Sequence, residues 1–494
     1  MQQLSELLKG MAEVAHTDDV AVSGLCDDSR DLIAGYVFLA YPGTHSDGRD
    51  YIYAALEAGA SAVIYEAKGF GMAAYESTVP LVAVSDLRAS LSRIAARFYG
   101  HPSRSLNIYA VTGTNGKTSV AHFLAQSLSH HRSAGVMGTL GNGLWGSLAN
   151  TSLTTPSALH VQELLGRMAG DGVRDVVMEA SSHGLSQDRL AAVHIDTAIF
   201  TNLSQDHLDY HKTMADYAAA KRRLFEVAGL RHAVVNVYDE FGAELAGSLP
   251  ANVSLMSYGL DTDARYSSTP PMVKGVLKRS DASGIEMLID SPYGSAKLAS
   301  SLFGRFNAEN LLAVLAALLV NNFSLDEAIS KLSAMRPIAG RMESFSLPHG
   351  PQVFVDFAHT PAALDLALSE LNQCCEGRVY LVFGCGGDRD QTKRALMGRI
   401  AQSLSSFTVL TDDNPRSEAP EKIIADILSG FEERKNVLIE HDRAKAIIFC
   451  LDHAQEGDIV LIAGKGHENY QLIGDQRLPF SDRELVRDYV RQAA

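Results

Sequence analysis

Apolar and polar positions alternate along most of the chain in a way that predicts repeated strand, loop and helix units. Short apolar runs at 108–113 (IYAVTG), 175–181 (DVVMEAS) and 197–203 (TAIFTNL) predict buried strands, and residues 119–128 (SVAHFLAQSL) predict a helix after the first of them. Strands that alternate with helices usually form a parallel sheet with helices on its faces. We therefore expect an α/β fold from residue 108 onwards.

A second series of the same kind follows a long apolar helix expected at 303–322. Residues 335–343 (MRPIAGRME) predict a linker before this second series. Residues 1–100 show only short apolar runs separated by turn signals. A chain of 494 residues is also too long for a single core. The prediction is three domains: a small mixed domain at 1–100, a parallel-sheet domain at 101–334 and a Rossmann-like domain at 335–494.

Composition narrows the class of protein. The net charge is −15, and proteins that bind nucleic acids usually present a basic face, so we expect no nucleic-acid partner. The five cysteines include no CxxC pair, which predicts neither a disulfide framework nor a zinc site and favours a cytoplasmic location. The N-terminal residues lack the apolar core of a signal peptide, and no apolar run reaches about 18 residues, so no membrane span is expected.

A glycine-rich turn, GTNGKTS, lies between the first predicted strand and its helix. Such a turn directs backbone N–H groups and the positive end of a helix at a polyphosphate. Lys117 can reach the terminal phosphates, and the Thr118 hydroxyl can ligate magnesium. Only two residues separate Gly113 from Gly116, where the standard P-loop has four, so a tight turn with a solvated lysine is the alternative. We expect an ATPase-like P-loop domain in which ATP is bound by Gly113, Thr114, Asn115, Gly116, Lys117, Thr118 and Ser119.

Carboxylate and histidine side chains follow the next two predicted strands. Glu179 ends the second strand, and His207 lies in the loop SQDHLDYH after the third. The carboxyl ends of strands in an open α/β sheet face the crevice where ligands bind, so both residues are candidate magnesium ligands. A capping carboxylate and a solvated loop are the structural alternatives. The segment SSHGLSQDRL adds a polar cluster suited to an acidic substrate, formed by Ser181, Gln187 and Arg189.

Lys221 lies in the apolar stripe of the helix expected at 214–228 (MADYAAAKRRLFEVA). It follows Tyr217 by four residues and precedes Phe225 by four, so the three side chains share one face. Desolvation at such a position lowers the pKa of a lysine amine. A neutral amine can react with carbon dioxide to form a carbamate, which is a carboxylate able to bind magnesium. A snorkelling lysine is the commoner explanation of this pattern.

Three strands of the last series end in charged or glycine-rich turns. The turns are GGDRD at 386–390, DNPR at 413–416 and GKGHE at 464–468. Because the ends of neighbouring parallel strands lie together, we expect these turns to line one pocket. Two arginines and a glutamate in one pocket match a ligand that has both carboxylates and ammonium groups.

The chain resembles the Mur ligase family in ten motifs that occur in the family's order over nearly the whole sequence. They are VTGTNGKTS, LTTPS, EASSHGLSQDRL, NLSQDHLDYH, the helix with Lys221, FNAENLLA, DFAHTP, GCGGDRD, DNPR and GKGHE. The resemblance implies an amide-forming reaction. ATP would phosphorylate a carboxylate of a uridine-diphosphate sugar peptide, and the amine of an amino acid would then attack the acyl phosphate.

The resemblance also implies roles for individual residues. Lys117, Glu179, His207 and Lys221 would be catalytic, with Mg²⁺ held by Thr118, Glu179, His207 and a carbamylated Lys221. ATP would also meet Asn307, Arg341 and Asp356. The uridine-diphosphate end would meet Asp27, Ser29, Thr44, His45 and Ser46, and the muramoyl peptide would meet Thr154, Thr155, Ser181, Gln187 and Arg189. The incoming amino acid would meet Arg389, Asp413, Asn414, Pro415, Arg416, Gly464 and Glu468.

Among family members, DNPR resembles the form found in those that add meso-2,6-diaminopimelate to UDP-N-acetylmuramoyl-L-alanyl-D-glutamate in peptidoglycan precursor synthesis. An arginine such as Arg416 can bind the distal carboxylate of diaminopimelate, which L-lysine lacks. The alternatives are addition of L-lysine, a folylpolyglutamate synthase-like ligase, and a nucleotide switch. The separate first domain and DNPR argue against the folate enzyme, and the absence of an NKxD-like motif argues against a guanine-nucleotide switch. We expect a monomer.

Overall fold

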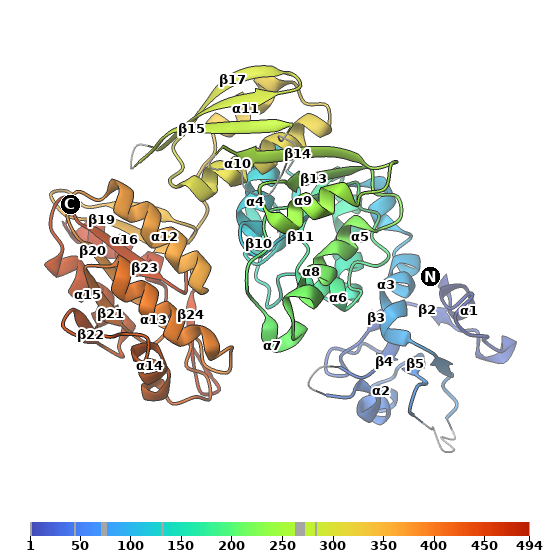
Figure 1. The fold of residues 1–494 in the computed structure, drawn as a ribbon. Coiled ribbons are helices and arrows are strands. Elements are labelled where there is room, and N and C mark those ends of the chain that lie inside the picture. The colour runs from blue at the N-terminus through green and yellow to red at the C-terminus, as the bar shows by residue number, and fades with distance from the viewer. Residues whose placement is uncertain are drawn as a thin grey trace.

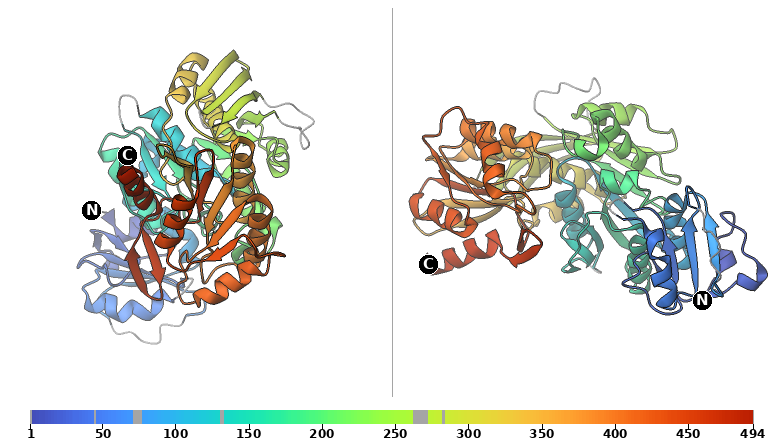
Figure 2. Two further views of the ribbon diagram at one scale, coloured as in Figure 1. Left: turned by 90° about the vertical axis from the view of Figure 1, so that its left-hand side faces the viewer. Right: turned by 90° about the horizontal axis from the view of Figure 1, so that it is seen from below.

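The computed structural model describes residues 2–43, 46–70, 77–129, 133–261, 272–281 and 284–493. They form three α/β domains that lie in a row, with the N-terminal and C-terminal domains at the two ends (Figure 1). Figure 2 shows the same arrangement from two further directions. The three-domain α/β fold expected from the sequence is confirmed. No helix within the described residues is both long and apolar enough to cross a bilayer.

The N-terminal domain is built on a parallel sheet of four strands in the order β3-β4-β5-β6. Its apolar core includes Ala158 and Leu159 at the start of helix α5 (Ala158–Gly170) of the central domain, so the first two domains share an apolar contact. The elements are β1 (Gln2–Gln3), α1 (Leu4–Leu7), β2 (Ala21–Val22), β3 (Leu25–Cys26), β4 (Val37–Ala40), α2 (Ile52–Glu57), β5 (Ala62–Glu66), β6 (Leu81–Val84) and α3 (Leu87–Phe98).

The central domain contains a sheet of eleven strands in the order β10-β9-β8-β11-β7-β12-β13-β14-β15-β16-β17. Its strands are β7 (Asn107–Thr112), β8 (Gly135–Gly138), β9 (Gly141–Leu144), β10 (Ser147–Ala149), β11 (Asp175–Glu179), β12 (Thr197–Phe200), β13 (His232–Asn236), β14 (Ser254–Leu260), β15 (Val273–Asp281), β16 (Gly284–Ser291) and β17 (Gly294–Ser300). Its helices are α4 (Lys117–Leu128), α5 (Ala158–Gly170), α6 (Ser182–Ser186), α7 (Leu208–His211), α8 (Met214–Arg222), α9 (Glu240–Gly247), α10 (Arg305–Val320) and α11 (Leu325–Ser333).

The central sheet is parallel in its middle, as expected from the sequence, and antiparallel at both edges. The neighbouring strands β8, β11, β7, β12, β13, β14 and β15 run parallel to one another. Strands β9 and β10 at one edge and β16 and β17 at the other pair antiparallel. The reason is visible in β16, where Ile285, Met287 and Ile289 point into the core while Leu288 and Asp290 are exposed. This period of two belongs to a sheet covered on one face, and helix α10 covers that face.

The C-terminal domain has a sheet of six strands in the order β18-β19-β23-β20-β21-β22, in which only β18 is antiparallel. The predicted linker is irregular up to Met342, and its last residue, Glu343, already begins β18. The elements are β18 (Glu343–Ser346), β19 (Gln352–Asp356), α12 (Pro361–Cys374), β20 (Val379–Phe383), α13 (Thr392–Leu404), β21 (Phe407–Leu410), α14 (Pro420–Leu428), β22 (Val437–Ile439), α15 (Arg443–His453), β23 (Ile459–Ala463), β24 (Tyr470–Ile473), β25 (Gln476–Pro479) and α16 (Asp482–Ala493).

Candidate active site

The glycine-rich loop between β7 and α4 has a backbone that strongly favours glycine at two positions. The φ angle is +148° at Gly113 and +84° at Gly116, where L side chains are strained. A Cβ on Gly113 would collide with the hydroxyl of Thr201, and one on Gly116 would lie 2.6 Å from Asn310 Oδ1. Because α4 begins directly after this loop, the loop joins a tight turn to the positive end of a helix dipole. The arrangement is suited to binding phosphate.

The Lys117 side chain folds back over the loop. Its Nζ donates to the carbonyl of Gly113 at 2.9 Å and to that of Thr114 at 2.8 Å. Burial lowers the pKa of the Lys117 amine, while the negative charges of Glu179 and Asp206 oppose that shift. The ammonium group is therefore held where a phosphate would need a cation.

Residues after β12 and on α8 hold the loop in place. The Asn115 N–H donates to Asn202 Oδ1 at 3.0 Å, and the Thr114 hydroxyl lies 3.2 Å from that of Tyr217. Ser119 is buried within α4. The whole predicted nucleotide loop is thus assembled in one place.

Glu179 ends β11 and lies against the phosphate loop. Thr118 Oγ1 donates to Glu179 Oε2 at 2.9 Å. Thr139 donates its backbone N–H to the same carboxylate at 2.8 Å and its hydroxyl at 3.1 Å. A hydroxyl and a carboxylate side by side provide oxygen atoms that can bind Mg²⁺ together with phosphate oxygens.

Lys221 is fully buried on α8, where its helix packs against the same loop. Its Nζ donates to the Gly113 carbonyl at 2.7 Å and lies 4.2 Å from the centre of the Tyr217 ring. Burial, followed by the positive charge of Lys117, lowers the pKa of the Lys221 amine well below its ordinary value. The desolvation expected from the helix pattern is therefore present in the structure.

His207 precedes α7, and its Nε2 lies 3.4 Å from Asp206 Oδ2. Its ring packs on that of His183 with 4.9 Å between centroids, and burial lowers the pKa of His207 to about 4. Among the described residues, no three histidine, cysteine or carboxylate side chains converge closely enough to hold a metal. Of the four predicted ligands, Thr118, Glu179 and Lys221 lie at the phosphate loop, whereas His207 faces Asp206.

Arg341 extends from the linker to the phosphate loop. Its Nη2 donates to Thr118 Oγ1 at 3.0 Å, and its guanidinium lies 4.5 Å from the centre of the Phe357 ring. Asp356 at the end of β19 accepts the Met342 N–H at 2.7 Å, and its charge opposes the lowering of the Arg341 pKa by burial. The start of the C-terminal domain therefore contacts the nucleotide loop of the central domain.

Two asparagines on α10 lie beside the loop. Asn307 is buried, donates to the Phe303 carbonyl at 2.8 Å and accepts from Asn310 Nδ2 at 3.3 Å. Asn310 in turn approaches Gly116 closely. The sequence prediction missed Asn310, although the spacing of three residues in FNAEN places it on the same helix face as Asn307.

A polar cluster lies beyond Glu179. Thr155 Oγ1 donates to the Glu179 carbonyl at 2.7 Å and lies 3.0 Å from Ser181 Oγ. The Thr154 hydroxyl lies 3.1 Å from that of Thr139, and the Thr139 hydroxyl donates to the Glu179 carboxylate. The residues predicted to meet the muramoyl peptide therefore share a network with the candidate metal ligand.

Arg189 lies at the seam between the first two domains. Its Nη1 donates to the Thr155 carbonyl at 2.5 Å and its Nη2 to Gln187 Oε1 at 2.7 Å. Burial lowers the Arg189 pKa, and Tyr41 of the first domain is close enough to oppose the shift. The Tyr41 hydroxyl donates to Asp27 Oδ2 at 3.0 Å. Asp27 of the first domain and Arg189 of the central domain, both predicted to bind substrate, therefore lie on either side of Tyr41 at this boundary.

Of the other first-domain predictions, only Ser29 and Ser46 are among the described residues. Ser29 is half-buried and Ser46 is exposed. Thr44 and His45 lie outside the described residues.

The turns after β20, β21 and β23 meet, as the strand order predicts. Asn414 Nδ2 donates to Glu468 Oε2 at 2.8 Å. Lys465 Nζ donates to Asn414 Oδ1 at 3.2 Å and to Glu468 Oε2 at 2.8 Å. Gly464 has φ of +111°, and a Cβ there would lie 2.6 Å from Asp413 Oδ2. Lys465 was not singled out from the sequence, although it lies within the GKGHE motif.

Arg416 has a left-handed backbone with φ of +53° and is half-buried beside this group. Its Nη1 donates to the Gly387 carbonyl at 2.7 Å. Burial, followed by the positive charge of the exposed Arg389, lowers the Arg416 pKa. Pro415 is buried. Within the described part of the chain, no carboxylate lies within ion-pair distance of the Arg416 guanidinium.

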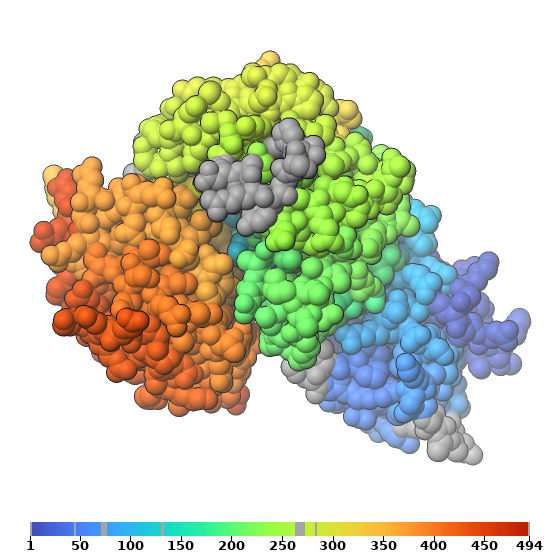
Figure 3. Space-filling view, in the orientation of Figure 1, coloured from blue at the N-terminus to red at the C-terminus, as the bar shows by residue number. Residues whose placement is uncertain are grey.

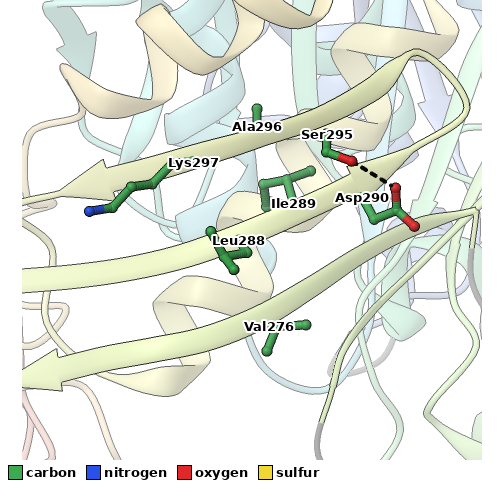
Figure 4. A pocket seen from close by; sticks show the side chains of 7 residues that line it. All are labelled: Val276, Leu288, Ile289, Asp290, Ser295, Ala296 and Lys297. Carbon is green, nitrogen blue, oxygen red and sulfur yellow. Dashed lines mark hydrogen bonds between the residues drawn. The ribbon is translucent and has the colours of Figure 1, made fainter.

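The surface is indented between the C-terminal domain and the part of the central domain that carries α7 and α8 (Figure 3). A separate shallow depression lies on the exposed face of β15, β16 and β17, where Ser295 donates to Asp290 at 3.2 Å (Figure 4). None of the predicted site residues lines that depression. We therefore place the candidate active site at the phosphate loop and the turns of the C-terminal domain.

Comparison with known proteins gives matches along the whole chain. Residues 111–318 match the Mur ligase middle domain, residues 340–466 match the Mur ligase glutamate ligase domain, and residues 21–99 match the catalytic domain of the Mur ligase family. Among curated relatives, UDP-N-acetylmuramoyl-L-alanyl-D-glutamate–2,6-diaminopimelate ligase of Coxiella burnetii is 44% identical over 487 residues and covers 98% of each chain. The protein of the same name from Pseudomonas aeruginosa is 46% identical and covers 94% of each.

Solved structures agree with these matches. A structure of UDP-N-acetylmuramoyl-L-alanyl-D-glutamate–2,6-diaminopimelate ligase is 36% identical, covers 95% of each chain and has a TM-score of 0.66. A folylpolyglutamate synthase from Mycobacterium tuberculosis is 19% identical, covers 76% of this chain and 92% of its own, and has a TM-score of 0.62, which shows a shared fold alone. On the strength of the motifs, the assembled loop and the near-complete coverage by relatives above 40% identity, the chain belongs to the Mur ligase family.

Proposed function

We propose that this protein is an ATP-dependent ligase that adds meso-2,6-diaminopimelate to the D-glutamate of UDP-N-acetylmuramoyl-L-alanyl-D-glutamate. Relatives at 44% and 46% identity are named for this reaction. The observation that carries the choice of amino acid is Arg416, a half-buried guanidinium without a carboxylate partner among the described residues. Such an arginine provides a site for a substrate carboxylate.

ATP binds at the phosphate loop in this proposal. The backbone N–H groups of the loop and of the α4 N-terminus hold the phosphates, and Lys117 and Arg341 add two positive charges beside them. An oxygen of the D-glutamate carboxylate attacks the γ-phosphorus, the bond from that phosphorus to the bridging oxygen breaks, and ADP leaves. The cations offset the repulsion between two anions that must approach each other.

The second step forms the amide. The uncharged amine of the amino acid attacks the carbonyl carbon of the acyl phosphate. The tetrahedral intermediate expels inorganic phosphate, and the amine nitrogen loses a proton. The turns that hold Asn414, Arg416 and Glu468 would orient the amino acid for this attack. Because these turns and the phosphate loop belong to different domains, closure of the domains on substrate is expected.

Mg²⁺ would be held by Thr118 and Glu179, with the carbamate of Lys221 beside the loop, whereas His207 faces Asp206 and would have to turn to reach the ion. The hydrogen bond from Thr118 to Glu179 supports this assignment, since it shows two oxygen donors side by side at the loop. Mg²⁺ usually takes one or two protein carboxylates and completes its shell with water and substrate phosphates, so a full cage of protein ligands is not needed. When bound, the ion would supply charge neutralisation at the phosphates.

Lys221 would carry a carbamate. Two observations support the modification: the amine is buried with a lowered pKa, which favours the neutral and reactive form, and it lies near a second lysine, the partly buried Lys117. A carbamate would place a negative charge beside the Lys117 ammonium, at a position where that neighbour disfavours a second positive charge. It would also add a carboxylate beside the phosphate loop.

The domains would divide the remaining work. Residues 1–100 would bind the uridine-diphosphate end, residues 101–334 would bind ATP, and residues 335–494 would bind the amino acid. Thr155, Ser181 and Arg189 would meet the muramoyl peptide. We place the protein in the cytoplasm as a monomer, since one copy of the chain carries residues for each of the three proposed substrates.

Release of ADP tests the ligase proposal. ADP should form rapidly only when ATP, Mg²⁺, the uridine-diphosphate dipeptide and an amino acid are all present, and mass spectrometry should detect the tripeptide product. A nucleotide switch would instead hydrolyse ATP slowly whether or not the other substrates were added. ADP release that does not depend on the amino acid would contradict the proposal.

A further inference from the structure

Arg394 on α13 is a fully buried cation beneath the proposed amino-acid pocket. Its guanidinium makes a two-pronged contact with Glu418: Nη1 donates to Oε2 and Nη2 to Oε1, both at 2.9 Å. Nη1 also donates to Asp426 Oδ2 at 2.8 Å, and Nη2 donates to the Gly386 carbonyl at 3.2 Å. None of these residues was predicted to bind substrate.

Glu418 connects this buried arginine to the turn that carries Arg389. The Asp388 N–H donates to Glu418 Oε1 at 2.6 Å, so one carboxylate holds both the α13 arginine and the backbone of the GGDRD turn. The hydrogen bond from Arg394 lowers the Glu418 pKa to about 2, and the carboxylate is therefore ionised at neutral pH. A fork contact between two ionised groups is stronger and more directional than a neutral hydrogen bond.

The GGDRD and DNPR turns are fastened to each other at several further points. Asp388 accepts from the Ser417 N–H at 3.1 Å and from the Ser417 hydroxyl at 2.7 Å. The Gly387 N–H donates to the Asn414 carbonyl at 2.9 Å, and Arg416 donates back to the Gly387 carbonyl. The turns approach so closely that a Cβ on Gly387 would collide with the neighbouring backbone.

We propose that Arg394 and Glu418 are positioning residues that set the spacing between Arg389 and Arg416, and thereby the selectivity for an amino acid with a distal carboxylate. This inference rests on the proposed function. Arg389 and Arg416 carry like charges on neighbouring turns, and repulsion between them favours separation of the turns. The ion pair of Arg394 and Glu418 opposes that separation from beneath, without touching the substrate itself.

The spacing matters because recognition of a carboxylate by guanidinium groups depends on their geometry. A fork contact requires the donors to be placed to within a fraction of an ångström, and a misplacement of about 1 Å costs about 100-fold in rate. L-lysine has no distal carboxylate, so its use should not depend on this spacing. Loss of the clamp should therefore reduce the preference for diaminopimelate rather than reduce all activity equally.

The main test compares Glu418→Gln with Asp426→Asn. Both convert a carboxylate partner of Arg394 to an amide, but Asp426 touches neither turn. In steady-state assays of phosphate release, Glu418→Gln should raise KM for diaminopimelate at least about 10-fold while kcat and KM for ATP change less than about 3-fold. Its ratio of kcat/KM for diaminopimelate over L-lysine should fall. Asp426→Asn should leave both values within about 2-fold of the parent.

A variant at the exposed Asp388 guards against misfolding caused by the loss of a partner of the buried Arg394. Asp388→Asn weakens the link to Ser417, and asparagine tolerates the left-handed φ of +53° at this position. It should raise KM for diaminopimelate in the same direction without lowering the melting temperature. Equal KM values in Glu418→Gln, Asp388→Asn and Asp426→Asn, or a uniform loss of kcat in all of them, would overturn the positioning role. A parent enzyme that does not use diaminopimelate would instead overturn the proposed function.

Discussion

Replacement of Gly340 with alanine is expected to lower kcat/KM about 100-fold by moving the linker relative to the phosphate loop. Gly340 has φ of +62°. An added Cβ would lie 2.7 Å from the Gly466 carbonyl oxygen, and closer still to the carbon and nitrogen of the same Gly466–His467 peptide bond. Non-bonded heavy atoms normally stay about 3.5 Å apart, so one of the two backbones must shift by about 1 Å.

The shift affects both halves of the reaction because of what lies next to the contact. Arg341 follows Gly340 directly and donates to Thr118 in the phosphate loop, whereas Glu468 follows Gly466 by two residues and belongs to the amino-acid pocket. Initial rates of ADP release should be measured while ATP and the amino acid are varied in turn. We expect kcat/KM to fall for both substrates.

Gly100→Ala is the matched control. Gly100 has a similar φ of +72°, but a Cβ there meets no atom within 4 Å. Both variants carry the left-handed penalty of roughly 1–2 kcal/mol for a non-glycine residue, so both should melt at a somewhat lower temperature. Only Gly340→Ala should lose activity at a temperature where both proteins are folded. Equal activity in the two variants would refute the idea that this contact positions Arg341.

The remaining predictions concern the lysine, the pocket and the metal. Lys221→Ala should lower kcat by at least about 100-fold with the fold retained by circular dichroism, and bicarbonate should not restore it; full activity would remove Lys221 from the reaction. Arg416→Ala should lower kcat/KM for diaminopimelate by about 10-fold to 150-fold, the equivalent of one charge-assisted hydrogen bond, with KM for ATP unchanged in the same assay. Chelation with EDTA should stop ADP release without changing the melting temperature, and excess Mg²⁺ should restore it; turnover that survives chelation would argue against a metal requirement.

Much of the site could be predicted from the sequence because its signals are local. The phosphate loop lies within one strand–turn–helix unit, and the burial of Lys221 follows from its spacing of four residues from Tyr217 and Phe225. The meeting of the three C-terminal turns follows from the rule that parallel strands end at the same edge of a sheet.

The rest depends on contacts between residues far apart in the sequence. Arg341 reaches Thr118 across 223 residues, and no periodicity in either segment indicates that pairing. Thr139 bonds Glu179 through its backbone N–H and its hydroxyl, but no pattern in the sequence pairs it with a residue 40 positions away. The antiparallel edges of the central sheet were missed because short alternating runs on a one-sided sheet resemble exposed loops.

The identity of the amino acid added is the central claim, and a panel of amino acids tests it most directly. Phosphate release should be measured with ATP, Mg²⁺ and UDP-N-acetylmuramoyl-L-alanyl-D-glutamate in the presence of meso-diaminopimelate, L-lysine, L-ornithine or no amino acid. Arg416 has no carboxylate partner among the described residues, which predicts that kcat/KM for meso-diaminopimelate exceeds that for L-lysine by at least about 10-fold, since lysine provides no carboxylate for the guanidinium. Equal or better use of L-lysine would contradict the account.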